Sequence, residues 1–151
     1  MDILQADDIV KINEVLHLWA FINDNKRFDL FDDVFTEDVQ FDWTYVGGPK
    51  GLNGIDVYRA LLQDAVDNGI VADHHILGSI VRMDKDGHVR VRSRYITHFG
   101  DGRMVNGEYL HILRRTPKGW RVSLHKMARR IPSLDIGAAP PEFFEGWPLA
   151  A

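Results

Sequence analysis

Apolar side chains recur at helical spacing in the first part of the chain. They are Ile9, Ile12, Leu16, Trp19 and Ile22. This spacing of three or four residues predicts an amphipathic helix with one apolar face. Asp7 or Asp8 is suited to cap its start, and the polar run "NDN", residues 23–25, indicates its end.

The following segments predict two more helices with a strand between them. A short helix fits "FDLFDDVF", residues 28–35, and a third helix follows Asn53 through "IDVYRALLQDAV". Between them, "VQFDWTYV" (residues 39–46) alternates strictly, with apolar and aromatic side chains on one face and polar ones on the other. This alternation predicts a half-buried strand, which the glycines of "GGPKG" then interrupt.

Beyond residue 70 the pattern is one of strands and tight turns. Four runs read as strands: "HILGSIVRM", "HVRVRSRYITHF", "RMVNGEYLHILRR" and "WRVSLHKMARRI". The segments between them, "DKDG", "GDG" and "TPKG", contain the Gly, Asp and Pro residues that hairpin turns require. We therefore expect a four-stranded antiparallel meander.

This order of elements predicts one α+β domain over residues 1–151. The economical packing is a strongly curved, mostly antiparallel sheet wrapped around the N-terminal helices, a cone-shaped barrel that encloses a pocket. Residues 132–151 contain four of the six prolines and form an irregular tail. Because Phe143, Phe144 and Trp147 would be costly to leave in water, the tail is expected to cover the mouth of the pocket. Packing on the outside of the sheet is the alternative.

The composition excludes several classes of function. A net charge of −4 argues against nucleic acid as a partner, and the chain has no cysteine for a disulfide or a thiolate site. No signal-peptide pattern and no run of about 18 apolar residues is present, so we expect a cytoplasmic protein without membrane contact. The seven histidines show no H-x-H or HExxH spacing, and we predict neither a metal nor a cofactor.

Two adjacent histidines open the first strand of the meander. Since neighbouring strand residues point to opposite faces, one of His74 and His75 must face inward. A neutral imidazole can move a proton in either direction near neutral pH, and a carboxylate on its second nitrogen fixes its tautomer. The alternative is a structural histidine bonded to the backbone.

The order helix, "NDNKRFDLFDDVFTEDVQFDW", helix, "DHHILGS" and meander resembles the SnoaL-like branch of the nuclear-transport-factor-2-like superfamily, and within it the scytalone dehydratases. The resemblance covers roughly residues 7–130. It implies catalytic roles for Asp24, His74 and His98. By simple alternation His98 lies on the arginine-bearing face of its strand, so a pocket position requires a bulge near Tyr95.

The resemblance also points to residues that would contact a substrate. They are Trp19, Asn23, Trp43, Tyr45 and Tyr109. Asn23 and Trp43 stand where the dehydratases have two tyrosines, and Gly107 and Tyr109 where they have serine and asparagine, so scytalone itself is not the expected substrate. Trp43, Tyr45 and Tyr109 are also compatible with plain core or sheet positions, as His111 and His125 are with surface or sheet positions.

Two functions remain from the sequence. The first is a cofactor-independent lyase or isomerase, a dehydratase of a small hydroxy-ketone or polyketide-like compound, acting through an Asp–His pair. The second is a non-catalytic module of the same fold that binds a small ligand or assembles subunits. The resemblance implies a homo-oligomer, with a trimer first and a dimer second.

Overall fold

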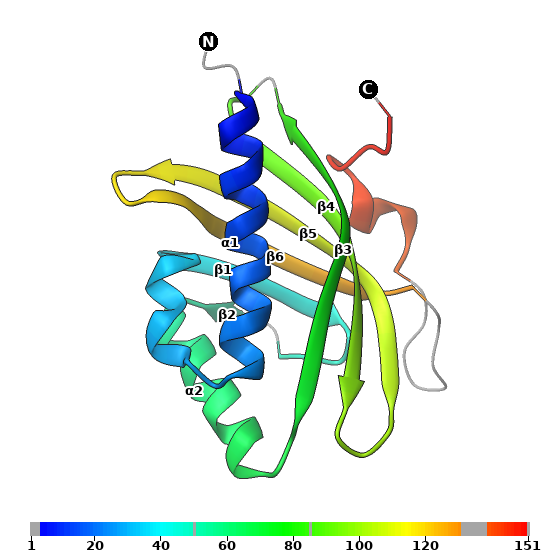
Figure 1. Cartoon of the computed structure of the whole chain (residues 1–151). Helices are drawn as coiled ribbons and strands as arrows, with labels where there is room; N and C mark the ends of the chain where they lie inside the picture. Colours follow the sequence, from blue (N-terminus) through cyan, green and yellow to red (C-terminus); the bar gives the residue numbers. More distant parts are fainter. Residues whose placement is uncertain (1–3, 50, 85, 131–138, 151) are drawn as a thin grey trace.

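The computed structural model describes residues 4–49, 51–84, 86–130 and 139–150 (Figure 1). Its elements in chain order are α1 (Ala6–Asp24), the 3₁₀ helix η1 (Phe28–Asp33), β1 (Phe35–Tyr45), β2 (Leu52–Asn53), α2 (Ile55–Asp67), β3 (Ala72–Met83), β4 (Val89–Phe99), β5 (Met104–Thr116), β6 (Gly119–Arg129) and the 3₁₀ turn η2 (Pro141–Phe144). The predicted helices and the meander are all present. The two-residue strand β2 was not predicted.

The six strands form one curved sheet in the order β2-β1-β6-β5-β4-β3. β1 runs parallel to β6, and every other pair is antiparallel. Figure 1 shows α1 crossing one face of this sheet, with α2 beside the lower end of α1. The prediction of an α+β fold with a curved sheet is thus confirmed. The sheet does not close into a barrel, because β2 and β3 are free edges.

The apolar face of α1 packs against the inner face of the sheet. Ile12, Leu16, Trp19 and Ile22 are buried as their spacing predicts, whereas Ile9 is 40% exposed. On β4 the alternation also holds, because Tyr95 and Thr97 are buried and the arginines point to the outer face. The core therefore lies between α1, α2 and the concave side of the sheet.

Asp8 ties the start of α1 to the sheet. The N-cap is Gln5, and the Asp8 carboxylate accepts its main-chain N–H at 3.1 Å. The same carboxylate accepts hydrogen bonds from Trp120 Nε1 at 3.1 Å and Arg115 Nη2 at 2.7 Å. These donors, the Gln5 N–H first, hold the pKa of Asp8 below its usual value. Asp8 thus caps the helix from inside its first turn.

The described part of the tail, residues 139–150, lies on the outer face of the sheet, opposite α1 (Figure 1). Phe143 and Trp147 are buried there against Leu110 and Ala128. The expectation of a lid is wrong for these residues, and residues 131–138 lie outside the described chain. The cause is the row of cations on that face, for example Lys126, whose Nζ lies 4.3 Å from the centre of the Phe143 ring.

Within the described residues, no helix is long and apolar enough to cross a membrane.

Candidate active site

A largely apolar cavity of about 630 Å³ opens between the inner face of the sheet, α1 and α2. Its lining comes from both helices, from strands β1 and β3–β6 and from the loop after β1. Its lining residues include Trp19, Asn23, Trp43, Tyr58, His74, Tyr95, Thr97, Tyr109 and Arg129. Its size suits an organic molecule of a few rings.

Asp24 and His74 meet at the wall of this cavity. Asp24 is the last residue of α1 and His74 the third residue of β3, and the carboxylate holds both the side chain and the main chain of the histidine. Asp24 Oδ1 lies 2.6 Å from His74 Nδ1, and Oδ2 accepts the His74 main-chain N–H at 2.9 Å. An ionised carboxylate only accepts hydrogen bonds, so Nδ1 carries the proton. Nε2 is left as the nitrogen available to a ligand.

The two neighbouring histidines do point to opposite faces. His74 lines the cavity with its side chain 19% exposed, and His75 lies on the outer face, where its Nε2 is 3.1 Å from Asp73 Oδ2. The inward histidine is therefore His74, the one to which the family resemblance pointed.

His98 does not reach the cavity, contrary to the role inferred for it. It is exposed on the outer face, with its ring 5.6 Å from that of His75. The bulge that would have turned it inward is absent, because β4 pairs with β5 without a register shift. The irregularity lies in β3 instead, between Leu77 and Ile80. Thr97 takes the inward position.

Four of the five predicted substrate contacts line the cavity: Trp19, Asn23, Trp43 and Tyr109. Tyr45 does not. Between the pairs Asp42–Lys126 and Tyr45–Ala128, β1 advances three residues while β6 advances two. The extra residue reverses the alternation. Tyr45 therefore packs on the outer face, with its ring centre 4.9 Å from that of Phe143.

Several polar lining residues were not predicted as site residues, among them Tyr58, Tyr95 and Arg129. Tyr58 lies on the buried face of α2 and accepts a hydrogen bond from Trp19 Nε1 at 3.1 Å. Burial raises the pKa of Tyr95 to about 12, although the charge of Arg129 opposes the rise. Helical spacing from Ile55 and alternation along β4 would have found the two tyrosines.

A buried histidine pair lies behind the cavity wall. His111 and His125 face each other across β5 and β6, with His111 Nε2 3.0 Å from His125 Nδ1. Burial lowers the pKa of His111 to about 3 and that of His125 well below its usual value. The prediction allowed a sheet position for both, and it missed the pairing because the partner is 14 residues away.

The model of the SnoaL-like domain matches residues 5–126. This chain belongs to the SnoaL-like family. A solved structure from Kribbella flavida, Kfla4162, is 26% identical, with a TM-score of 0.74 over 85% of this chain and 94% of that one. No curated protein matches the chain.

Two solved structures from Novosphingobium aromaticivorans share the fold of this SnoaL-like protein. One, provisionally assigned as an aromatic ring hydroxylase, is 24% identical, with a TM-score of 0.71 over 88% of this chain and 98% of that one. The other, provisionally assigned as a scytalone dehydratase, is 16% identical, with a TM-score of 0.71 over 91% and 97%. The resemblance inferred from the sequence is therefore confirmed at the level of family and fold.

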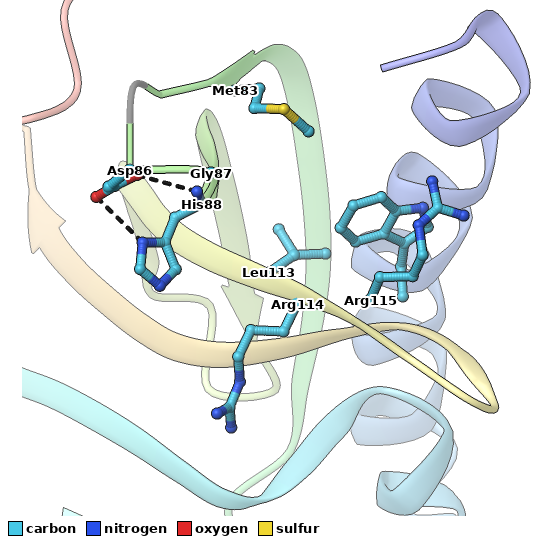
Figure 2. A pocket seen from close by; sticks show the side chains of 8 residues that line it. Met83, Asp86, Gly87, His88, Leu113, Arg114 and Arg115 are labelled. Carbon is cyan, nitrogen blue, oxygen red and sulfur yellow. Dashed lines mark hydrogen bonds and ion pairs between the residues drawn. The ribbon is translucent and has the colours of Figure 1, made fainter. Parts of the chain in front are cut away.

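A second, smaller pocket of about 260 Å³ lies at the other end of the meander in this SnoaL-like protein (Figure 2). Arg114, Arg115 and the exposed pair of Asp86 and His88 contribute to its lining. It holds none of the residues predicted to act on a substrate. We therefore assign the candidate site to the larger cavity.

The larger cavity of this SnoaL-like protein combines the His74 imidazole, a proton acceptor, with neutral hydrogen-bond donors. His74 Nε2 can take a proton, and the imidazolium that results is stabilised by Asp24. The hydroxyls of Tyr95 and Tyr109 stay protonated, because burial raises the pKa of both. Such a set can remove a proton next to a carbonyl and stabilise the enolate oxygen.

Proposed function

We propose that this SnoaL-like protein is a cofactor-independent lyase or isomerase that acts on a small hydroxy-ketone of the polyketide-like aromatic or alicyclic class. Dehydration is the first reaction to test, with isomerisation and cyclisation next. The observation that carries the proposal is the contact of Asp24 with His74 at the wall of a largely apolar cavity. The family and the fold shared with a provisionally assigned scytalone dehydratase support it.

The proposed dehydration uses His74 for both proton transfers. His74 Nε2 removes the proton α to the carbonyl, and the electron pair of that C–H bond forms the enolate. The enolate then forms the C=C bond as the bond from the β carbon to its hydroxyl breaks. The imidazolium returns its proton to the departing hydroxyl, which leaves as water. One base therefore replaces the pair of histidines expected from the sequence.

Other cavity residues would hold the substrate in place. Trp43 Nε1 and the Tyr95 hydroxyl are shielded from solvent and have no hydrogen-bond partner within the described ranges. A buried donor without a partner costs free energy. A substrate oxygen would satisfy either group. Trp19, whose ring centre is 5.2 Å from that of His74, would keep the imidazole oriented.

The test is a screen of hydroxy-ketones and polyketide-like compounds with the wild type and two variants. We expect His74→Ala and Asp24→Asn to lower turnover by about 10²-fold or more, the usual contribution of a general acid or base. Loss of water from the substrate, followed by absorbance and mass spectrometry, is the readout.

His88→Ala is the matched control, because His88 also contacts an aspartate, Asp86 (Figure 2), but lies at the β3–β4 turn and does not line the cavity. It should keep full turnover. If His74→Ala matched the wild type, the proposal would be wrong. A compound that binds in the cavity without being converted by any variant would favour the ligand-binding function.

We further propose that the chain forms a homo-oligomer, a trimer first and a dimer second. The support is the set of large apolar side chains left exposed, such as Phe21 at 66% and Met104 at 62%. Phe143 and Trp147 of the tail do not belong to this exposed set, because they are buried on their own sheet. Light scattering at micromolar concentration tests this proposal, and a monomer would contradict it.

A further inference from the structure

Three side chains of types that can ligate a metal ion gather on the outer face of the sheet, opposite the candidate active site. Asp73 and His75 are two residues apart on β3, so they share a face. His98 lies on β4 in direct register with Asp73. All three are exposed, so an ion could reach them without opening the fold.

The geometry suits a single ion. One ligand atom from each residue lies within 4.8 Å of the others, and His75 Nε2 and Asp73 Oδ2 are already 3.1 Å apart. Two ligands of a tetrahedral Zn²⁺ are about 3.3 Å apart, given bond lengths near 2.05 Å. The β3–β4 ladder is unbroken from Ala72 to Leu77 and fixes the three backbones. Small rotations of the exposed side chains would therefore complete the site.

We propose that Asp73, His75 and His98 bind one divalent transition-metal ion. Two imidazoles and one carboxylate favour Zn²⁺, Ni²⁺ or Cu²⁺ over Mg²⁺ and Ca²⁺, which take oxygen ligands. Three protein ligands leave a fourth position for water or an external group. The carboxylate neutralises part of the charge of the ion, and the exposed position keeps the desolvation cost small.

The proposal is independent of the proposed function. His74, which lies between Asp73 and His75 in sequence, points to the other face and lines the cavity. Removing His98 would therefore leave the catalytic pair in place. Each proposal can fail without the other.

The experiment is calorimetric titration of Zn²⁺ into the full chain without a histidine tag. We expect one ion per chain for the wild type. His98→Ala, His75→Ala and Asp73→Asn should each weaken binding at least roughly tenfold, since losing even an outer-shell partner of a ligand costs that much. Zn²⁺ should also raise the unfolding temperature of the wild type but not of His98→Ala.

His88→Ala is the matched control here too. His88 and Asp86 lie 3.1 Å apart, the same distance as His75 and Asp73. Within the described residues, however, His88 and Asp86 belong to no group of three possible metal ligands. This variant should bind Zn²⁺ like the wild type. If His98→Ala, folded by circular dichroism, bound Zn²⁺ as the wild type does, or if the wild type bound no stoichiometric ion, the site would be refuted.

Discussion

Gly107 determines how closely the strands approach beside the cavity. It lies on β5, opposite Tyr95 on one side and Arg129 on the other. A Cβ atom here would collide with the main-chain oxygen of Ala128 and would come within 2.7 Å of the Tyr95 ring. The glycine therefore leaves the space in which the Tyr95 ring stacks on Tyr109, with the ring centres 4.3 Å apart.

Gly107→Ala should destabilise the protein by roughly 3 kcal/mol, the upper part of the usual range for overpacking, because a backbone oxygen cannot move aside. Urea unfolding measures this loss. Gly100→Ala is the control, since its nearest contact, Val71 Cβ at 3.1 Å, is much less close than the contact at Gly107 and should cost clearly less stability. If Gly107→Ala were as stable as the wild type, the prediction would be wrong, because β5 and β6 could then move apart at no cost in stability.

Residue by residue, the sequence was most informative where alternation or helical spacing is regular. Alternation showed that one of two adjacent histidines faces inward, and the family resemblance pointed to His74 and to Asp24, which the structure brings together at the cavity wall. The prediction failed at Tyr45 because a bulge in β1 has no clear sequence signal, and at His98 because the role required a bulge that β4 does not have. The proximity of His98 to Asp73 and His75 could not be predicted from spacing along the sequence, because His98 lies on another strand.

At the scale of elements, the tail and the outer face of the sheet hold each other in place. The Arg92 guanidinium lies 4.5 Å from the centre of the Phe144 ring, and Trp147 Nε1 donates to the His111 main-chain oxygen at 3.3 Å. The arginines on the outer face of β4 therefore pack against the aromatic side chains of the tail, although the two features are far apart in the sequence. Neither pattern alone indicated the other.

Trp147→Ala should cost about 3 kcal/mol, because a buried indole and its hydrogen bond are lost. Ligand binding in the cavity should be unchanged. Leu149→Ala is the control in the same segment, as Leu149 is 64% exposed and should contribute less than about 0.5 kcal/mol. Thermal unfolding and ligand titration separate the outcomes, and weaker ligand binding at unchanged stability would contradict this prediction.

At the scale of the whole molecule, the buried pair of His111 and His125 makes stability depend on pH. Burial lowers the pKa of both in the folded state, whereas in the unfolded chain each titrates near pH 6.5. Below that pH the unfolded state binds more protons than the folded state. Stability is therefore complete above about pH 7 and falls as the pH is lowered towards the folded pKa values.

Between pH 6 and 5 each of the two histidines should remove up to roughly 1.4 kcal/mol per pH unit. Urea unfolding of the wild type and of the double variant His111→Leu, His125→Leu at pH 7.5 and 5.5 checks this. The variant should lose much less stability than the wild type over that interval. Equal losses, or two ring signals that titrate near pH 6.5 in the folded protein by NMR, would contradict it.

The sheet is open, and β3 is one of its two edge strands. Such an edge offers free main-chain groups to any passing strand. At His74 the free N–H is already taken by Asp24 Oδ2 at 2.9 Å. A strand from another molecule could pair at this point only by displacing the carboxylate that holds the imidazole. The contact that, as we propose, prepares His74 for proton transfer thus also takes up a main-chain donor that an aggregating strand would need at this point of the edge.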